Sequence, residues 1–260
     1  REEGITSGRG AEVGADAAAD RRQDAYDATC LARGAQKHRE RPVPGTGLDG
    51  VLPAREFLPQ ENRREQGQAA PGGVTAAHKN VVVLGGGSTG ADCVATAHRQ
   101  GAKQVVQIGI NQKPPSERPA DNPWPETAQV YTKTYAQEEG GVQEFAVNTT
   151  ELADLDGDGR VDELRAERVD WTYENGSRAD KTVVDPNVRV PADLVLVAIG
   201  FVGPERHPFA ALGVRQTDDG TVATRDRLMT HVHRVFAAGD PRMAAPLVLG
   251  AHRAGRASAH

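Results

Sequence analysis

The sequence has few cysteines, few aromatic residues and no long apolar run. Of its 260 residues only two are cysteine and 4% are aromatic. Cys30 and Cys93 stand far apart, which argues against a disulfide-stapled secreted fold. We expect both as free buried thiols in a reducing, cytoplasmic compartment. No apolar run reaches the roughly 20 residues that span a bilayer, so no transmembrane helix is predicted.

An excess of charge of one sign is also lacking. Lysine and arginine number 31, aspartate and glutamate number 36, and the net charge is −5. A strongly basic surface would be the electrostatic footprint of a partner such as nucleic acid or an anionic membrane. We therefore expect neither partner. The length is sufficient for one large domain or two ordinary ones.

Neither end of the sequence has the features of a natural terminus. The chain starts at Arg1 without a methionine. It stops at His260 within "LVLGAHRAGRASAH", a pattern typical of a helix. We interpret the sequence as a C-terminal fragment of a longer protein.

Glycine, by contrast, is abundant, and three glycines stand in a pattern of nucleotide-binding turns. Gly85, Gly87 and Gly90 have the spacing G-x-G-x-x-G within "VVVLGGGSTGADC". That spacing is informative only between a strand and a helix. The apolar run 81–84 predicts a buried parallel strand, and "ADCVATAHRQ" after the glycines has helical spacing. A second strand is predicted at 104–108.

The three glycines have separate physical roles in such a turn. Gly85 permits the tight turn, Gly87 lets the backbone approach a pyrophosphate, and Gly90 lets the helix pack closely on the strand. The first N–H groups of the helix carry a partial positive charge that favours phosphate. A glycine-rich turn without a ligand is the weaker alternative. The predicted phosphate-binding set is Gly85, Gly86, Gly87, Ser88, Thr89 and Gly90.

The end of the second strand decides which nucleotide is expected. NAD sites of this type place Asp or Glu there, against the 2′-hydroxyl of the ribose. No acid occurs between Asp92 and Glu117. The same interval contains cations at Arg99, Lys103 and Lys113. We expect NADPH, with Arg99 and Lys113 on the 2′-phosphate and Lys103 as a solvated surface cation.

Two further segments combine an apolar strand with glycine. "ADLVLVAIGFVGPE" (192–205) predicts a buried strand that ends at Gly200. "VFAAGD" (235–240) predicts a short strand that ends at Gly239 and Asp240. Many flavoproteins use a Gly-Asp after a strand to place a carboxylate on the ribityl chain of FAD. We predict cofactor binding by these two glycines and this aspartate, with an ordinary helix N-cap as the alternative for Asp240.

Two motifs resemble metal sites but lack a complete set of ligands. "DLDGDGRVDELR" (154–165) begins like an EF-hand loop, but its twelfth residue is Arg165, where a bidentate carboxylate is required. We predict a hairpin turn there. His231 and His233 lack a third ligand in the sequence around them, so we expect surface histidines and no metal ligand.

Secondary structure is also predicted outside these motifs. A short strand is expected from Tyr26 and a helix at 54–64. The stretch 65–78 is rich in glycine, alanine and proline and indicates a linker or domain boundary. Two strands are expected at 146–152 and 161–173.

Four of these segments together indicate a family. "VVVLGGGSTGADCVATAHRQGAKQV", "PPSERPADNPWPE", "PADLVLVAIGFVGPE" and "VFAAGD" occur in this order. In this ordered set the sequence closely resembles the small (beta) subunits of bacterial NADPH-dependent glutamate synthases. Those subunits belong to the pyridine nucleotide–disulfide oxidoreductase-like flavoproteins. The resemblance runs from about Gly4 to Ala259.

The resemblance implies an α/β fold of the two-dinucleotide flavoprotein type. A Rossmann-like NADPH-binding domain (74–200) would be inserted into a partial FAD-binding domain made of residues 1–73 and 201–260. The implied activity is that of an NADPH-dependent oxidoreductase, in which FAD accepts hydride from NADPH. Electrons would then pass through iron–sulfur clusters outside this chain to the large subunit, which makes glutamate from glutamine and 2-oxoglutarate. Because the cofactors carry the reaction, no catalytic side chain is expected.

Several positions on the flavin side depart from the family pattern. The first FAD fingerprint and the cysteine-rich cluster region do not occur in this sequence. Arg33 replaces the threonine of an Ala-Thr-Gly turn, "MAAP" (243–246) replaces Arg-Gly-Gln-Ser, and Gly250 replaces an aromatic residue. These departures predict that the chain binds NADPH but holds FAD poorly.

Two alternatives stay open. One is a related NAD(P)H-dependent flavoprotein reductase that serves another acceptor, such as ferredoxin or a pyrimidine-reducing partner. The other is a truncated nucleotide-binding remnant without activity, which the altered flavin-side residues support. The segment "ADNPWPE" (120–126) favours glutamate synthase over the first alternative.

Overall fold

The computed structural model describes most of the chain from residue 28 onward. The predictions that concern Arg33, the start of a strand at Tyr26 and most of "MAAP" lie outside the described residues. The described residues are 28–32, 34–68, 72–125, 128–174, 177–204, 206, 209–210, 212–243 and 248–258.

Contacts divide the chain into two compact units. The outer unit comprises Arg1–Arg39 and Phe201–His260, and the inserted unit comprises Glu40–Gly200. One unit is thus inserted into the other along the sequence. The compact inserted unit begins at Glu40, whereas we expected the NADPH-binding domain to begin at residue 74. The limits of the cofactor-binding domains themselves stay a prediction.

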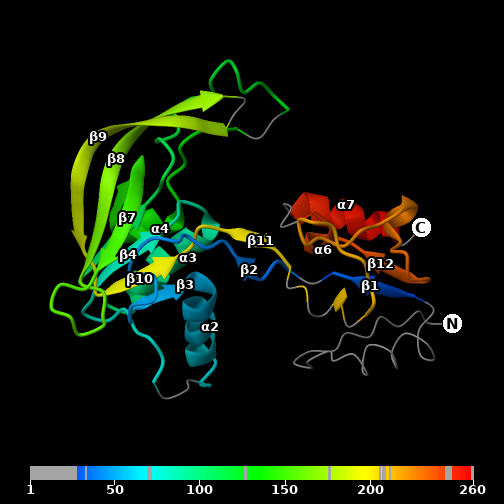
Figure 1. Cartoon of the computed structure of the whole chain (residues 1–260), viewed down its shortest axis with the longest axis horizontal. Helices are drawn as coiled ribbons and strands as arrows, with labels where there is room; N and C mark the ends of the chain where they lie inside the picture. Colours follow the sequence, from blue (N-terminus) through cyan, green and yellow to red (C-terminus); the bar gives the residue numbers. More distant parts are fainter. Residues whose placement is uncertain are drawn as a thin grey trace. The chain divides into compact units, whose positions relative to one another are not determined.

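The centre of the inserted unit is a five-stranded parallel sheet (Figure 1). All four neighbouring pairs of strands run parallel. The strands predicted at 81–84 and 104–108 are confirmed as its third and fourth members. In order across the sheet the strands are β3 (Val51–Pro53), β10 (Leu194–Val197), β4 (Asn80–Leu84), β5 (Gln104–Ile108) and β6 (Val142–Glu144).

Alternate residues of β4 explain why the strand is apolar along its whole length. Val81 and Val83 belong to a core formed with the helices of this unit. Val82 and Leu84 belong to a second core on the other face, with residues of an antiparallel sheet. Both faces are therefore covered, as expected of a parallel sheet. The helices are α2 (Ala54–Glu65), α3 (Ser88–Arg99) and α4 (Tyr135–Glu139).

Strand β3 and helix α2 account for the early start of the inserted unit. Val51 of β3 lies opposite Val195 of β10 in parallel register. Phe57 of α2 is fully buried in the helix-side core. Burial of a phenylalanine side chain stabilises a fold by about 1.5–3 kcal/mol, so α2 is held firmly on this sheet. The helix predicted at 54–64 is confirmed.

The antiparallel sheet of the inserted unit has the order β7-β8-β9. Strands β7 (Val147–Ala153) and β8 (Glu163–Glu174) confirm the predicted hairpin. Strand β9 (Ser177–Pro191) was not predicted. It contains Pro186 and many charged residues, and it is stabilised by its pairing with β8 along most of its length.

In its described residues, the outer unit contains two pairs of short strands. β1 (Thr29–Leu31) runs parallel to β12 (Val235–Ala237), and β2 (Lys37–His38) pairs antiparallel with β11 (Phe201–Gly203). The buried strand that we expected to end at Gly200 is confirmed as β10 (Leu194–Val197), and β11 was not predicted.

Short helices complete the described part of the outer unit. They are the 3₁₀ helix η1 (Asp226–Leu228), α6 (Asp240–Met243) and α7 (Val248–Ser258). Phe209 and Val222 are buried in the core of this unit with Val235 of β12. Among the described helices of the whole chain, none is long and apolar enough to cross a membrane.

Candidate functional site: a glycine turn at the carboxyl edge of the parallel sheet

The glycine turn between β4 and α3 has the shape that its sequence predicts. Gly85 has a φ of +123°, and a Cβ there would lie 2.2 Å from the carbonyl oxygen of Ala198. A Cβ on Gly90 would lie 2.3 Å from the carbonyl oxygen of Gly85. Both distances are far below van der Waals contact. Only glycine fits at these two positions, one for the turn and one for the close packing of α3 on β4.

The other two glycines of the turn face open space. A Cβ on Gly86 or Gly87 would have no atom of a described residue within 4 Å. Gly86, Gly87 and Ser88 are exposed, whereas Gly90 is buried. The turn is thus tight toward the protein and open toward solvent. A phosphate can approach the backbone on the open side without displacing a side chain.

The first turn of α3 offers donors to such a phosphate. Its N-cap is Gly87, which has extended backbone, and no described side chain caps it. The first N–H groups of a helix have no intrahelical partner, and they carry the positive end of the helix dipole. The first turn of α3 also contains no acid. The N–H groups around Gly87, Ser88 and Thr89 are therefore suited to an anion.

Arg99 lies away from this turn. It is the last residue of α3, whereas Ser88 is the first, and twelve residues of α-helix span about 17 Å. The Arg99 guanidinium is ion-paired with Glu139, its Nε lying 3.1 Å from a carboxylate oxygen. This hydrogen bond raises the pKa of Arg99 above its ordinary value. The structure therefore does not bring Arg99 to the glycines, and its predicted contact with a 2′-phosphate is not supported by its position.

Lys113, in contrast, lies just past the carboxyl end of β5. Its Nζ stands 4.7 Å from the centre of the Tyr131 ring and 6.0 Å from that of Phe145. The two rings pack edge to face at 5.9 Å. Phe145 directly follows β6, and parallel strands end at one edge of a sheet. Lys113 thus extends from the same sheet edge as the glycine turn and stays exposed above an aromatic platform.

The sequence did not reveal that the buried amide of Gln107 contacts the glycine turn. Gln107 of β5 is only 2% exposed. Its Nε2 donates to the carbonyl oxygen of Gly85 at 2.8 Å, and its Oε1 accepts from Nε2 of Gln137 at 2.7 Å. The sequence signal was the second glutamine of "QVVQI", a polar residue within the apolar part of a buried strand.

In the outer unit, Asp240 connects the segments that follow β1 and β12. It follows Gly239, whose φ is +68°, and begins α6. Its carboxylate accepts from the backbone N–H of Ala35 at 2.5 Å. Because β1 and β12 are parallel, both strands end at the same edge, and this bond connects Ala35 after β1 with Asp240 after β12. Gly200, with a φ of +91°, is the last residue of the inserted unit and lies between β10 and β11.

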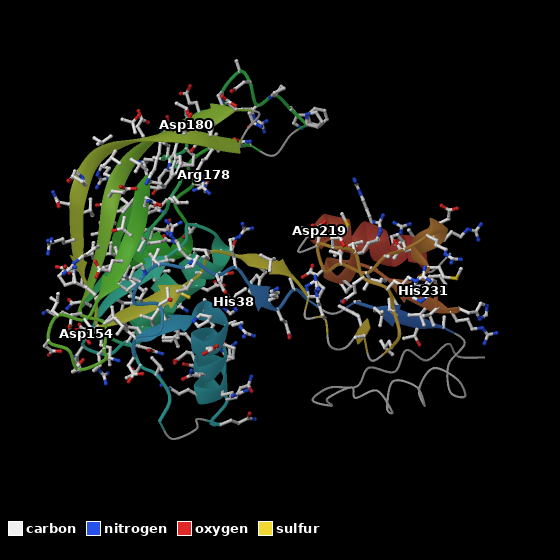
Figure 2. The ribbon with its side chains drawn as sticks, in the orientation of Figure 1. His38, Asp154, Arg178, Asp180, Asp219 and His231 are labelled. Atoms are coloured by element: carbon white, nitrogen blue, oxygen red, sulfur yellow. The ribbon has the colours of Figure 1, made fainter. Side chains whose placement is uncertain are left out.

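The acidic loop between β7 and β8 is a turn stabilised by its own carboxylates. Asp154 accepts from the N–H groups of Gly157 at 2.6 Å and Gly159 at 2.8 Å, and these bonds lower its pKa. Asp154, Asp156 and Asp162 hold oxygens within 4.8 Å of one another. Figure 2 shows Asp154 in this loop, far along the sheet from Arg178 and Asp180 of β9. The predicted hairpin turn is confirmed.

The two cysteines differ in their surroundings, and neither forms a disulfide. Cys93 is buried in α3, and burial raises the pKa of its thiol to about 12. Cys30 is exposed, so the expectation that it is buried was wrong, since β1 has only three residues and one strand partner.

Strand β4 of the parallel sheet leads into a tight glycine turn and then into a helix that no described side chain caps. This arrangement defines a dinucleotide-binding protein of the α/β class. A family model described as "Pyridine nucleotide-disulphide oxidoreductase" matches residues 3–255. The chain therefore belongs to the pyridine nucleotide-disulphide oxidoreductases, and the α/β fold class predicted from its sequence is confirmed.

Relatives of known name give a more detailed comparison. Over its whole length the sequence is 43% identical to "Glutamate synthase [NADPH] small chain" of Mycobacterium tuberculosis strain H37Rv. Over 98% of its length it is 34% identical to the protein of the same name in Bacillus subtilis strain 168. The chain spans 53% of the length of each relative, about half.

Solved structures show the same fold. Mycobacterium tuberculosis FprA in complex with NADPH matches 90% of this chain and 62% of its own, with a TM-score of 0.64 and 16% identity. Thioredoxin reductase from T. acidophilum matches 89% of this chain and 62% of its own, with a TM-score of 0.52 and 15% identity.

Proposed function

We propose that this chain supplies the NADPH-binding part of a flavoprotein of the glutamate synthase small-chain type, an NADPH-dependent oxidoreductase. The observation that carries the proposal is the β4–α3 turn, which is tight toward the protein and open toward solvent. The 43% identity to a small chain named for NADPH supports the choice of enzyme.

This chain has groups that would bind the pyrophosphate and the 2′-phosphate of NADPH. Backbone N–H groups at Gly86, Gly87, Ser88 and Thr89 would hold the pyrophosphate, because the turn is open and the helix is uncapped. Lys113 would hold the 2′-phosphate, since it lies at the same edge of the sheet. NADPH supplies a hydride when it is bound. The chain's share is to bind and orient the nucleotide.

FAD would be the second cofactor, and this chain offers it little. Gly239 and Asp240 form a turn at the carboxyl edge of β1 and β12, where a flavin's ribityl chain would fit. However, one Asp240 oxygen is already bonded to the N–H of Ala35. Helix α6 begins at Asp240 and is described as far as Met243. We propose that the chain alone holds FAD weakly.

The remaining steps would lie outside this chain. Iron–sulfur clusters of the complete small subunit would carry electrons to a large subunit in the cytoplasm, where glutamate is made. Gly200, the last residue of the inserted unit, stays a proposed cofactor-binding residue.

Absorption spectroscopy and a dye-reduction assay of the purified 260-residue chain test this proposal. We expect NADPH to bind, flavin bands to be far below one FAD per chain, and no steady NADPH-dependent dye reduction. One FAD per chain together with steady dye reduction would contradict the weak FAD site. Failure to bind NADPH would contradict the proposal as a whole.

A further inference from the structure

The buried amide of Gln107 contacts the glycine turn directly. Its Nε2 donates to the carbonyl oxygen of Gly85 at 2.8 Å. The backbone N–H of the same glycine donates to the carbonyl oxygen of Ile108, also at 2.8 Å. Two neighbouring residues of β5 therefore fix both polar groups of Gly85. The Gly85 carbonyl shares a peptide plane with the N–H of Gly86, so the bond from Gln107 helps set the direction of that N–H.

The third glycine of the motif leaves room for this contact. A Cβ on Gly90 would lie 2.9 Å from Nε2 of Gln107, in addition to its clash with Gly85. A side chain there would displace the amide from the turn. The space at Gly90 therefore serves the hydrogen bond of Gln107 as well as the packing of α3 on β4.

The other end of the amide leads toward Lys113. Gln107 lies opposite Gln143 in the register of β5 and β6. Nε2 of Gln143 donates to Oε1 of Gln107 at 3.3 Å, and Oε1 of Gln143 accepts from the Tyr131 hydroxyl at 3.1 Å. The face of the Tyr131 ring lies under the Lys113 ammonium. A continuous polar chain thus runs from the glycine turn to this lysine.

We propose that Gln107 is a positioning residue of the nucleotide site. Through Gly85 it orients the turn that would receive the pyrophosphate, and through Gln143 and Tyr131 it orients the platform under Lys113. The preference for NADPH over NADH then depends on a buried side chain that touches neither phosphate. This inference rests on the proposed function, since it assigns a determinant of selectivity to the same site.

The physical reason is the cost of an unmade hydrogen bond in a place partly shielded from water. Without the amide, the Gly85 carbonyl loses its donor, and the Nε2 groups of Gln137 and Gln143 lose their acceptor. These three groups are half-buried, so each lost partner is replaced only in part by water, and the turn and the two glutamines would rearrange. The rearrangement would disturb both the glycine turn and the Tyr131 ring beneath Lys113.

Calorimetric titration of the full chain with NADPH and with NADH tests the inference. Gln107→Leu should weaken NADPH binding by at least about tenfold and NADH binding by less. NADPH would contact both the glycine turn and Lys113, whereas NADH has no 2′-phosphate for Lys113. Gln143→Leu and Tyr131→Phe should weaken NADPH binding by about threefold and leave NADH binding unchanged. Tyr131→Phe keeps the ring beneath Lys113, so its effect reports the hydroxyl alone.

The matched control is Gln104→Leu. Gln104 is the first residue of β5 and is exposed, so the same amide is removed from the same strand outside the site. It should bind both nucleotides as the unchanged chain does. An unaltered ratio of NADPH to NADH affinity in Gln107→Leu, Gln143→Leu and Tyr131→Phe would overturn the inference. If Gln107→Leu does not fold, the two other variants decide. Absence of NADPH binding by the unchanged chain would instead overturn the proposed function, and this inference with it.

Discussion

The two units each contain a strand that enters a glycine turn and a helix, but the turns are built in opposite ways. In the inserted unit, the turn after β4 leaves its backbone donors open, and buried residues hold it from below. In the outer unit, the turn after β12 ends in Asp240, whose carboxylate binds the N–H of Ala35. In the turn after β4, no described side chain occupies the side that faces solvent. The turn after β12 uses its carboxylate to join two segments of its own unit.

The comparison separates two meanings of a strand–glycine–helix motif. A turn that exposes N–H groups at the start of a three-turn helix is suited to a pyrophosphate. In the turn after β12 the Asp240 carboxylate is already engaged by the N–H of Ala35, so that turn offers a ligand fewer free groups. Two similar strand–glycine–helix motifs are therefore expected to bind their cofactors with different affinities.

The largest effect is expected from Gly85→Ala. A Cβ at this position would lie 2.2 Å from the Ala198 carbonyl oxygen, at a φ of +123°. Strain and overpacking together should lower the free energy of unfolding by roughly 3 kcal/mol or more. Denaturant unfolding measures this change. Gly86→Ala is the matched control, because its Cβ meets open space, and a similar loss there would contradict the account.

Gly87→Val should abolish nucleotide binding while the fold survives. Two methyl groups would stand where a phosphate must approach the backbone, and no described atom lies within 4 Å of the new Cβ. NADPH affinity should fall at least about a hundredfold, since several charge-assisted hydrogen bonds of about 1.5–3 kcal/mol each are lost. Calorimetry measures the affinity and circular dichroism the fold. Normal NADPH binding would show that the glycines only make a turn.

Lys113→Met should affect NADPH and spare NADH. Loss of one charge-assisted contact to the 2′-phosphate should weaken NADPH binding by about tenfold. Lys103→Met is the control, because Lys103 is exposed at the amino end of β5. Equal losses for both nucleotides in Lys113→Met would place the lysine outside the 2′-phosphate site.

Asp240→Ala should give the smallest effect. The Ala35 N–H loses its partner in a half-buried place, which should lower the stability of the outer unit by about 1–2 kcal/mol. NADPH affinity should stay unchanged, because the glycine turn belongs to the other unit. Thermal unfolding and an NADPH titration of this variant measure the two quantities. A drop in NADPH affinity without a drop in stability would contradict the division between the turns.

Elements with strong local signals were predictable from the sequence. The run 81–84, the three glycines and the helix after them define a strand, a turn and a helix within a short stretch. The β7–β8 hairpin was predictable because its loop is rich in aspartate and glycine. In these cases the residues that decide the structure are neighbours in the sequence.

Elements that depend on distant pairing were not predictable in this way. Strand β9 has charged residues along both faces, and only its pairing with β8 makes it a strand. Strand β3 joins the inserted unit through β10, which lies more than 140 residues later in the chain. No local pattern shows either partnership.

The site residues also differ in whether local sequence or distant contacts determine their positions. The glycines were predictable because backbone geometry alone requires them. Arg99 lies at the far end of α3 from the glycines because of the length of that helix, which its charge alone did not reveal, and its contact with the 2′-phosphate stays a prediction. Gln107 was missed because its partners come from a turn, a helix and a neighbouring strand that meet only in the fold.

The central claim is that the β4–α3 turn, together with Lys113, binds NADPH selectively. The most direct measurement is a calorimetric titration of the purified chain with NADPH and with NADH at low salt. The account predicts that NADPH binds at least about tenfold more tightly, because charge-assisted contacts to the 2′-phosphate are available only to it. Equal dissociation constants for the two nucleotides would contradict the claim.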